Sequence, residues 1–308
     1  MSTRTPKKTG NKHAKLNILR AQHLSDLSWL VHGFSTRVGG FSRAYRKGDL
    51  NLGFTKDDDG RAVERNRSAF LHEVGAADTR RNKLSALWPV VTLRQVHSDI
   101  IHCVDSHSAD PPSRDRRTGD GLITATPGLL LAIQTADCLP VILVDAKRRA
   151  VGVFHAGWRG TVKRIVEKGV GQMQYRFGSR PRDLRAAIGA GIHGCCYEVG
   201  EDVRTKFESQ FPYASKLFRE VKDSDPVREK YPLLFLTARA PGHGELPNKV
   251  FLDLVEANRQ QLLEAGVSLK NIWSSQLCTN CNTDLLFSYR GEKGKTGRLM
   301  GVVGVRDR

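Results

Sequence analysis

The sequence predicts one mixed α/β domain, and three observations support this fold class. The chain has 308 residues, which fit one large domain or two small ones, and no linker-like stretch divides them. Short apolar or β-branched runs lie only a few residues apart at 121–125, 129–135, 139–144 and 150–155. Such short connections favour antiparallel neighbours, because a parallel crossover needs about a dozen residues. An amphipathic helix over residues 161–177 follows directly, so strands and helices share one unit.

The residues before this central region predict a tail, a strand, a helix and an extended segment. Residues 1–20 carry six basic residues and no acid, so we expect a disordered basic tail before a single domain over 21–308. Residues 29–35 have the pattern of a strand, and residues 61–74 keep one apolar face at helical spacing. Residues 90–101 are expected to be extended.

The remaining elements alternate between loops, strands and helices. Residues 105–120 are rich in Pro, Ser and Asp and are expected to form a loop, since Pro111 and Pro112 prevent a helix or a central strand. Further strands are expected at 185–188, 271–276, 284–289 and 298–305, and further helices at 200–210 and 249–265.

Composition and charge exclude several classes of protein. Hydrophobic residues make up 39%, enough for a packed core, which excludes a disordered or collagen-like chain. No apolar stretch approaches the roughly 20 residues that cross a bilayer, and no secretory signal is apparent, so we expect a cytoplasmic protein. The net charge of +17 could attract nucleic acid or anionic small molecules. The basic residues are scattered and not interleaved with aromatics, so a nucleic-acid partner is not expected.

Three residues are candidate metal ligands because of where they fall. His97 ends the predicted strand TLRQVH (92–97), Cys138 lies in a turn between two apolar strands, and His155 ends another strand. Two imidazoles and a thiolate suit zinc, and three protein ligands leave the fourth position for water or substrate. Their wide separation matches no short motif, so a buried thiol with two hydrogen-bonded histidines is the alternative.

Neighbouring polar residues extend this candidate site. Asp137 adjoins the candidate thiolate, and Gln95 lies two residues before the first histidine. Either side chain could form a hydrogen bond to a metal-ligating side chain or to the substrate. The motif HAGWRG at 155–160 leads into the predicted helix, for which Thr161 is a reasonable N-cap. The free N–H groups of that helix and the guanidinium of Arg159 would bind an anion such as phosphate. An ordinary surface arginine is the alternative for Arg159.

Other motifs carry less weight. Residues 189–194 match GxGxxG after a predicted strand, but the helix does not open there, so a nucleotide cofactor is not expected. Cys278 and Cys281 form a CxxC without a second pair, which is weak evidence for zinc or thioredoxin chemistry. Copper is less expected than zinc, because copper sites with two histidines and a cysteine commonly add an axial methionine, and Met173 lies on the apolar face of the helix.

Eight segments, taken in order, resemble one protein family. They are FSTRVGG (34–40), LNLGF (50–54), RQVHSD (94–99), QTADCLPV (134–141), HAGWRG (155–160), AIGAGIHGCCYEVG (187–200), LDLVEANRQQLLEAGV (252–267) and CTNC…FSYR…TGR (278–298). The family is that of the laccase-domain, polyphenol oxidase-like proteins, whose members are also described as purine nucleoside phosphorylases and as peptidoglycan editing factors. The resemblance extends over about residues 29–305, nearly the whole chain.

The resemblance implies a four-layer α/β/β/α fold with mixed β-sheets and a zinc ion held by His97, Cys138 and His155. It also implies phosphorolysis of adenosine, inosine, guanosine and methylthioadenosine, and deamination of adenosine. The partners would then be a purine nucleoside and phosphate, and no association with a membrane is expected. The protein would be a monomer or a homodimer. The loop at 105–120 and the segment 219–247 look longer than is usual in the family.

The matching positions also supply candidate roles in binding and catalysis. Candidate contacts to the substrate or phosphate are Arg37, Asn51, Gln95 and Arg159. The usual signature of zinc deaminases is absent, so acid–base catalysis is expected from Asp137 or from Cys138 itself.

Three other functions stay open. The first is a hydrolase that edits peptidoglycan precursors, with zinc or with Cys138 as a nucleophile activated by a histidine. The second is a copper-dependent polyphenol oxidoreductase. The third is a non-enzymatic RNA-associated protein, which rests on charge alone and whose binding would fall steeply with salt.

Overall fold

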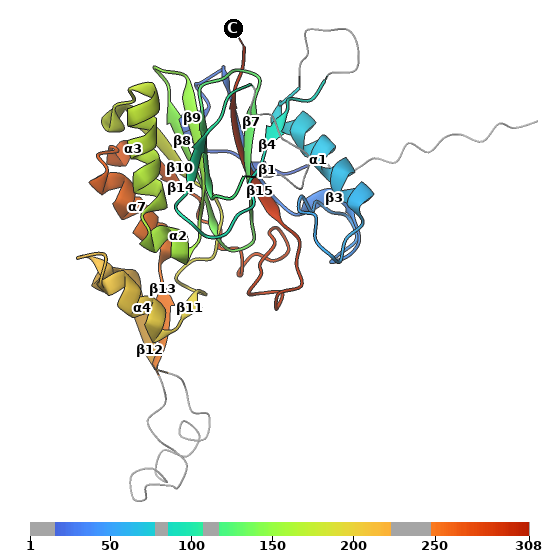
Figure 1. Ribbon diagram of the computed structural model, residues 1–308. Coiled ribbons are helices and arrows are strands. Elements are labelled where there is room, and N and C mark those ends of the chain that lie inside the picture. The colour runs from blue at the N-terminus through green and yellow to red at the C-terminus, as the bar shows by residue number, and fades with distance from the viewer. Residues whose placement is uncertain (1–15, 78–85, 107–116, 223–247, 308) are drawn as a thin grey trace, which may run out of the picture.

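Two β-sheets stacked face to face form the centre of the molecule, and helices cover both outer faces (Figure 1). The computed structural model describes residues 16–77, 86–106, 117–222 and 248–307. Helix α1 (Gly60–Val74) covers the first sheet, while α3 (Ile165–Phe177) and α7 (Leu254–Glu264) cover the second. The expected α/β/β/α order of layers is confirmed.

The first sheet is mixed and has the order β1-β2-β15-β7-β4. Its strands are β1 (Ile18–Leu19), β2 (Leu30–Ser35), β15 (Leu299–Val305), β7 (Leu130–Thr135) and β4 (Val90–Val91). Only β4 runs parallel to its neighbour, β7. Because β1 pairs with β2, the tail expected over residues 1–20 is shorter than predicted at its inner end. Residues 1–15 lie outside the described part of the chain.

The second sheet is also mixed and has the order β14-β10-β8-β9-β6-β5. Its strands are β14 (Ile272–Ser274), β10 (Leu184–Ile188), β8 (Leu139–Asp145), β9 (Ala150–Ala156), β6 (Gly121–Thr124) and β5 (Ile101–Cys103). The antiparallel pairing expected in the central region holds for β8 with β9 and for β6 with β9. It fails for β7, which belongs to the other sheet.

A small third sheet lies beside this sandwich, with α4 (Glu201–Glu208) next to it (Figure 1). Its order is β11 (Glu198–Val199), β13 (Asn248–Leu252) and β12 (Phe218–Lys222), all antiparallel. The helix predicted over 249–265 is therefore wrong at its start, where β13 occupies residues 248–252. The helix begins after Asp253, whose carboxylate accepts a hydrogen bond from the Glu256 N–H and caps it.

Strands with two buried faces explain the continuous apolar runs. In β8, Ile142 and Val144 point into the core between the sheets, while Val141 and Leu143 point toward α3 and α7. A strand in this position needs apolar residues on both sides, unlike a strand with one face in water. No helix in the described ranges is long and apolar enough to span a membrane.

The chain crosses from the first sheet to the second between β7 and β8. The connection consists of residues 136–138, so Cys138 lies where the two sheets meet. Asp137 adopts a φ of 86° in this short crossover, a conformation that Asp tolerates better than most residues. The crossover therefore holds the candidate thiolate at one end of the sandwich.

Four more predictions need correction. The helix expected over 161–177 is broken into α2 (Trp158–Val162) and α3, because Arg164 between them has a left-handed φ of 63°. Thr161 is thus inside α2 and is not an N-cap. Residues 284–289 form turns and not a strand, and most of residues 90–101 lies between β4 and β5. The remaining short elements are β3 (Val38–Ser42), η1 (Gln22–Leu24), η3 (Pro181–Asp183), η4 (Ala214–Leu217) and η5 (Leu269–Asn271).

Candidate metal centre

The three predicted metal ligands come together at one end of the two sheets. Ligand atoms of His97, Cys138 and His155 all lie within 4.8 Å of one another. The Cys138 Sγ is 3.8 Å from Nε2 of His97, and the two imidazole rings meet edge to face with centroids 4.8 Å apart. Residues from a loop, from the sheet crossover and from β9 thus form a group that could hold a metal ion.

A buried carboxylate, Asp120, organises this group. Its Oδ1 accepts hydrogen bonds from Nδ1 of His155 at 2.8 Å and from the backbone N–H of His97 at 3.0 Å. Its Oδ2 accepts from the N–H of Val96 and from both the N–H and the hydroxyl of Ser98. Because Nδ1 of His155 is occupied, its Nε2 is the nitrogen left to bind a metal, as in carboxylate–histidine–metal arrangements.

The loop that carries His97 turns sharply around this carboxylate. His97 has a φ of 58°, a left-handed conformation that is uncommon outside glycine. Three consecutive N–H groups, from Val96 to Ser98, converge on Asp120 and hold the turn in place. The sequence-based expectation that His97 ends a strand is therefore wrong, although the side chain reaches the predicted place.

Charge within the group favours the thiolate of Cys138. Burial alone would raise the pKa of this thiol, but His155 and His97 outweigh it and lower the pKa to about 6. Burial would lower the pKa of His155, yet the thiolate of Cys138 and the carboxylate of Asp120 raise it to about 9. The thiolate is the form of cysteine that binds metals and acts as a nucleophile.

The triad opens into a cavity of about 530 Å³, which is within the range of small-molecule sites. Three arginines line it, namely Arg159, Arg290 and Arg298. Aromatic rings line it as well, namely those of Trp158, Tyr197 and Tyr289. The cavity therefore joins a possible metal site, positive charge and flat apolar surfaces.

Comparisons with known proteins identify the family of this chain. A family model described as "multi-copper polyphenol oxidoreductase laccase" matches residues 31–306. The chain belongs to this laccase family. A purine nucleoside phosphorylase of Deinococcus radiodurans is 37% identical to it over 296 residues, which cover 94% of this chain and 93% of that protein.

Two further proteins are similar to this chain. The crystal structure of the hypothetical protein YfiH of Bacillus licheniformis is 32% identical and superposes with a TM-score of 0.76, covering 94% of this chain and 96% of that one. A protein named adenosine deaminase RL5, from an unknown prokaryotic organism, is 33% identical over 213 residues, 68% of this chain and 72% of its own length. Two different activities are thus named among the relatives.

Glycine is required next to the triad in this member of the laccase family. A Cβ added at Gly157 would lie 2.8 Å from the Cys138 Sγ and 2.9 Å from Cδ2 of His97. Real Cβ atoms essentially never approach other atoms so closely, so the ligands would have to move. The backbone of Gly157 therefore forms one wall of the possible metal site, and the donor set of two imidazoles and one thiolate fits a catalytic zinc ion.

We expect Gly157→Ala to weaken metal binding by about 10- to 100-fold, the range seen when groups that orient metal ligands are changed. Metal affinity of the purified protein, measured by competition with a chelator, checks this. Gly171→Ala is the matched control, because Gly171 lies inside α3 with no atom near the added Cβ. The control should bind metal normally and gain about 0.5–1 kcal/mol of stability. Equal metal affinity in both variants would contradict the expected contact.

Two predicted substrate contacts lie away from the cavity. Arg37 is 1% exposed, and its guanidinium donates to the carboxylates of Asp49 and Glu292 and to the carbonyl of Thr283. Asn51 is fully buried, and its Oδ1 accepts from the backbone N–H of Arg298 at 2.8 Å. Both residues therefore support the segments that carry cavity arginines, and a direct contact to phosphate finds no support in their placement.

The other predicted residues line the cavity but are partly engaged within the protein. The side-chain amide of Gln95 exchanges two hydrogen bonds with the backbone of Gln134 in β7, each 2.8 Å long. The carboxylate of Asp137 accepts from the hydroxyls of Thr279 and Ser288 and from the N–H of Arg290. Gln95 thus fastens the His97 loop to the first sheet.

Arg159 is the predicted contact with the most accessible charge. It is exposed, and its guanidinium carbon lies 4.6 Å from the centroid of the Trp158 ring. The helix that follows it, α2, has only five residues, so the anion site expected at the start of a long helix is not formed there. The positive charge near the triad comes from side chains instead.

Sequence reasoning missed several residues of the site. Asp120 lies directly before an apolar strand at the end of the 105–120 loop, a place with no distinctive pattern. Tyr289, Arg290 and Arg298 lie in the FSYR and TGR segments that contributed to the family resemblance. The signal for these three was present in the motifs, but nothing in their spacing predicted that they would face the triad.

Proposed function

We propose that this chain is a zinc-dependent purine nucleoside phosphorylase acting on adenosine, inosine, guanosine and methylthioadenosine. One observation carries the proposal: a single cavity contains the His97–Cys138–His155 group, three arginines and three aromatic rings. The name of the Deinococcus relative, which matches over nearly the whole chain, supports the same reaction.

The arginines would bind the phosphate. No ion pair with a carboxylate is found for Arg159, Arg290 or Arg298 within the described ranges, so their charges are not neutralised there. Arg298 donates through Nη1 to the carbonyls of Thr296 and Gly297, which leaves its other N–H groups for a ligand. Guanidinium groups hold phosphate by paired, charge-assisted hydrogen bonds. The N–H of Arg290 is fixed by Asp137, which places the arginine at the edge of the cavity beside the triad.

The aromatic rings would bind the purine. Tyr197 is nearly buried, and the Arg290 guanidinium carbon lies 5.5 Å from its ring centroid. Tyr289 is 53% exposed, and Trp158 is half-buried next to the triad. Flat π-systems of this kind stack with bases. The cavity therefore offers an apolar surface for the base and a charged one for phosphate.

The reaction follows from this division of the cavity. A phosphate oxygen held by the arginines attacks C1′ of the ribose, and the bond between C1′ and the purine nitrogen breaks. Its electron pair stays on the purine, which takes up a proton to leave as the free base. Asp137 remains the proposed source of that proton, whereas Cys138, which the triad favours as a thiolate, has no proton to donate. A divalent ion on the triad would supply Lewis acidity and positive charge beside the reacting bond.

The donor set supports zinc over copper. Copper sites that use two histidines and a cysteine commonly add a weak axial methionine. Among the described residues, Met173 and Met300 are both buried in hydrophobic cores and neither lines the cavity. A polyphenol oxidoreductase, which the printed description of the family names, is therefore the less supported alternative.

Purified protein incubated with inosine, with and without inorganic phosphate, tests the proposal. We expect hypoxanthine and ribose 1-phosphate to form only when phosphate is present. Equal release of hypoxanthine without phosphate would indicate hydrolysis, and no turnover of any purine nucleoside would refute the proposal.

We expect Arg290→Ala to raise the KM for phosphate by about 10- to 100-fold, because a hydrogen bond to a charged group contributes about 1.5–3 kcal/mol. The backbone bond from residue 290 to Asp137 survives this change. Arg182→Ala is the control. Arg182 lies just before β10, whose first residue pairs with Asp145 at the end of β8 opposite to Cys138 and the cavity. Steady-state kinetics at varied phosphate concentrations check both variants. A similar KM in the two would exclude Arg290 from phosphate binding.

Two further activities share observations with the proposed one. Adenosine deamination is favoured by the relative named adenosine deaminase and would use the same triad. A hydrolase with Cys138 as nucleophile is favoured by the lowered pKa of its thiol beside His155. Chelation separates them from each other: deamination of adenosine would disappear without metal, whereas a cysteine hydrolase would stay active.

A further inference from the structure

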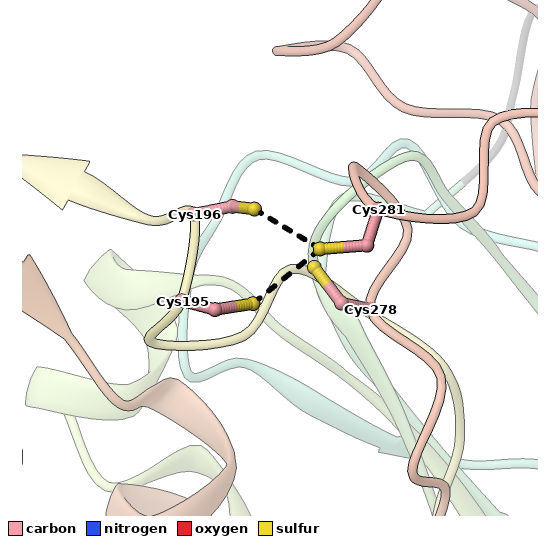
Figure 2. Close-up of side chains that lie close together, drawn as sticks. All are labelled: Cys195, Cys196, Cys278 and Cys281. Atoms are coloured by element: carbon pink, nitrogen blue, oxygen red, sulfur yellow. Dashed lines mark hydrogen bonds between the residues drawn. The ribbon is translucent and has the colours of Figure 1, made fainter.

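Four cysteines outside the triad lie together at a second place in the molecule (Figure 2). Cys195 and Cys196 come from the loop between β10 and β11, and Cys278 and Cys281 come from the segment between β14 and β15. All four sulfur atoms lie within 4.8 Å of one another. The Cys281 Sγ is 3.6 Å from that of Cys195 and 3.3 Å from that of Cys196.

We propose that these cysteines form a second metal site, which binds a divalent zinc-type ion through four thiolates. A tetrahedral zinc ion with Zn–S bonds of about 2.3 Å places its sulfurs about 3.8 Å apart. The separations of 3.3 and 3.6 Å from the Cys281 Sγ are close to that distance, no pair of sulfurs is more than 4.8 Å apart, and all four side chains point toward a common centre (Figure 2). A disulfide would need a much shorter sulfur–sulfur distance of about 2.05 Å and would use only two of the four.

The backbone around the cluster already holds the cysteines in place. Cys278 forms a parallel β-bridge with Gly191, and the N–H of Thr279 donates to the Gly191 carbonyl at 2.9 Å. The N–H of His193 points to the Cys278 Sγ at 3.5 Å, a contact that favours a thiolate. Cys278 is buried while Cys195 and Cys281 are exposed, so an ion can enter from solvent.

The second site differs in kind from the triad. Four protein ligands close the coordination of a tetrahedral ion, which is typical of structural sites, whereas three leave a position for substrate. In sequence, the CxxC motif at 278–281 supplies only two of the four ligands that such a site needs. The fold brings Cys195 and Cys196 next to it, and they supply the other two. The pair was invisible in sequence because adjacent cysteines match no common zinc spacing.

The ion would join two walls of the catalytic cavity. The loop with Cys195 and Cys196 continues into Tyr197, and the segment with Cys278 and Cys281 continues into Tyr289 and Arg290. A metal bridge between these segments would fix the distance between the rings and the arginine that line the cavity. This consequence rests on the proposed function, whereas the metal site itself does not.

Metal content of the reduced protein, purified with zinc and dialysed, tests the site. We expect Cys281→Ser to hold one zinc ion fewer per chain than the unchanged protein. Cys103→Ser is the matched control, because Cys103 is exposed on β5 and is not part of either cluster, and it should lose none. The comparison is valid whether or not the triad holds an ion, so it is independent of the proposed function.

Cobalt substitution gives a second readout, whose main measurement uses the unchanged protein. The unchanged protein titrated with cobalt should develop the strong charge-transfer absorption of a tetrathiolate site, and Cys138→Ala should retain it. Equal zinc content in Cys281→Ser and the unchanged protein would overturn the proposal. Absence of the tetrathiolate absorption, or a mass lower by two hydrogens that shows a disulfide among these cysteines in the reduced protein, would overturn it too.

Discussion

Replacing Cys138 with alanine is expected to remove the ion from the triad and to lower nucleoside cleavage by about 1,000-fold or more. A bound metal contributes several kcal/mol to a transition state, and each 1.4 kcal/mol or so is tenfold in rate. The two imidazoles that remain, held by Asp120, do not supply the charge of the thiolate. Zinc content and kcat/KM with inosine and phosphate measure the two effects.

Cys103→Ala is the control for this variant, since Cys103 is exposed on β5 and does not line the cavity. It should leave both measurements unchanged. The contrary result would be a Cys138→Ala protein that loses activity while the unchanged protein stays active after complete chelation. Cys138 would then act as a nucleophile and not as a ligand.

Changing Asp120 to asparagine is expected to destabilise the fold by about 3–5 kcal/mol, as when one partner of a buried charge pair is removed. Metal affinity should also fall by about 10- to 100-fold, because the group that orients His155 is lost. Asparagine has the same shape but only one acceptor oxygen, so its amide would face N–H donors of the 96–98 turn or of His155. Urea unfolding and a zinc competition assay measure the two changes.

Asp145→Asn provides the matched control. Asp145 is also a buried carboxylate, but it lies at the opposite end of β8, and among the described residues its side chain accepts only from the N–H groups of Lys147 and Arg148, both through Oδ1. Asparagine can keep both bonds, so we expect at most about 1 kcal/mol of destabilisation and normal metal affinity. If Asp120→Asn also kept normal metal affinity, its carboxylate would not orient the ligands.

The sequence predicted best those elements whose pattern is set by local burial. The runs at β8 and β9 are apolar on both faces, and their predicted bounds differ from the observed ones by one residue. The prediction failed where long-range pairing decides the structure. Residues 248–252 carry apolar side chains compatible with a helix, but β11 and β12 on either side recruit them into a sheet.

The candidate site divides in the same way. The residue types of His97, Cys138 and His155 indicated a metal site, and the fold brings them together. The family resemblance made Arg37 a candidate phosphate contact, whereas its partners Asp49 and Glu292 become neighbours only in the folded chain. Asp120 was missed for the converse reason: a carboxylate in a polar loop is ordinary until five donors converge on it.

The crossover at residues 136–138 has a consequence for the whole molecule. The three ligands of the triad come from different parts of the fold. His97 lies on a loop that is hydrogen-bonded to the first sheet, Cys138 lies in the connection between the sheets, and His155 lies on a strand of the second sheet. An ion bound there is attached to both halves of the sandwich, and the halves cannot separate without releasing it. A ligand that binds only the folded state raises stability with the logarithm of its free concentration. The melting temperature of this protein is therefore expected to rise with the concentration of free divalent metal.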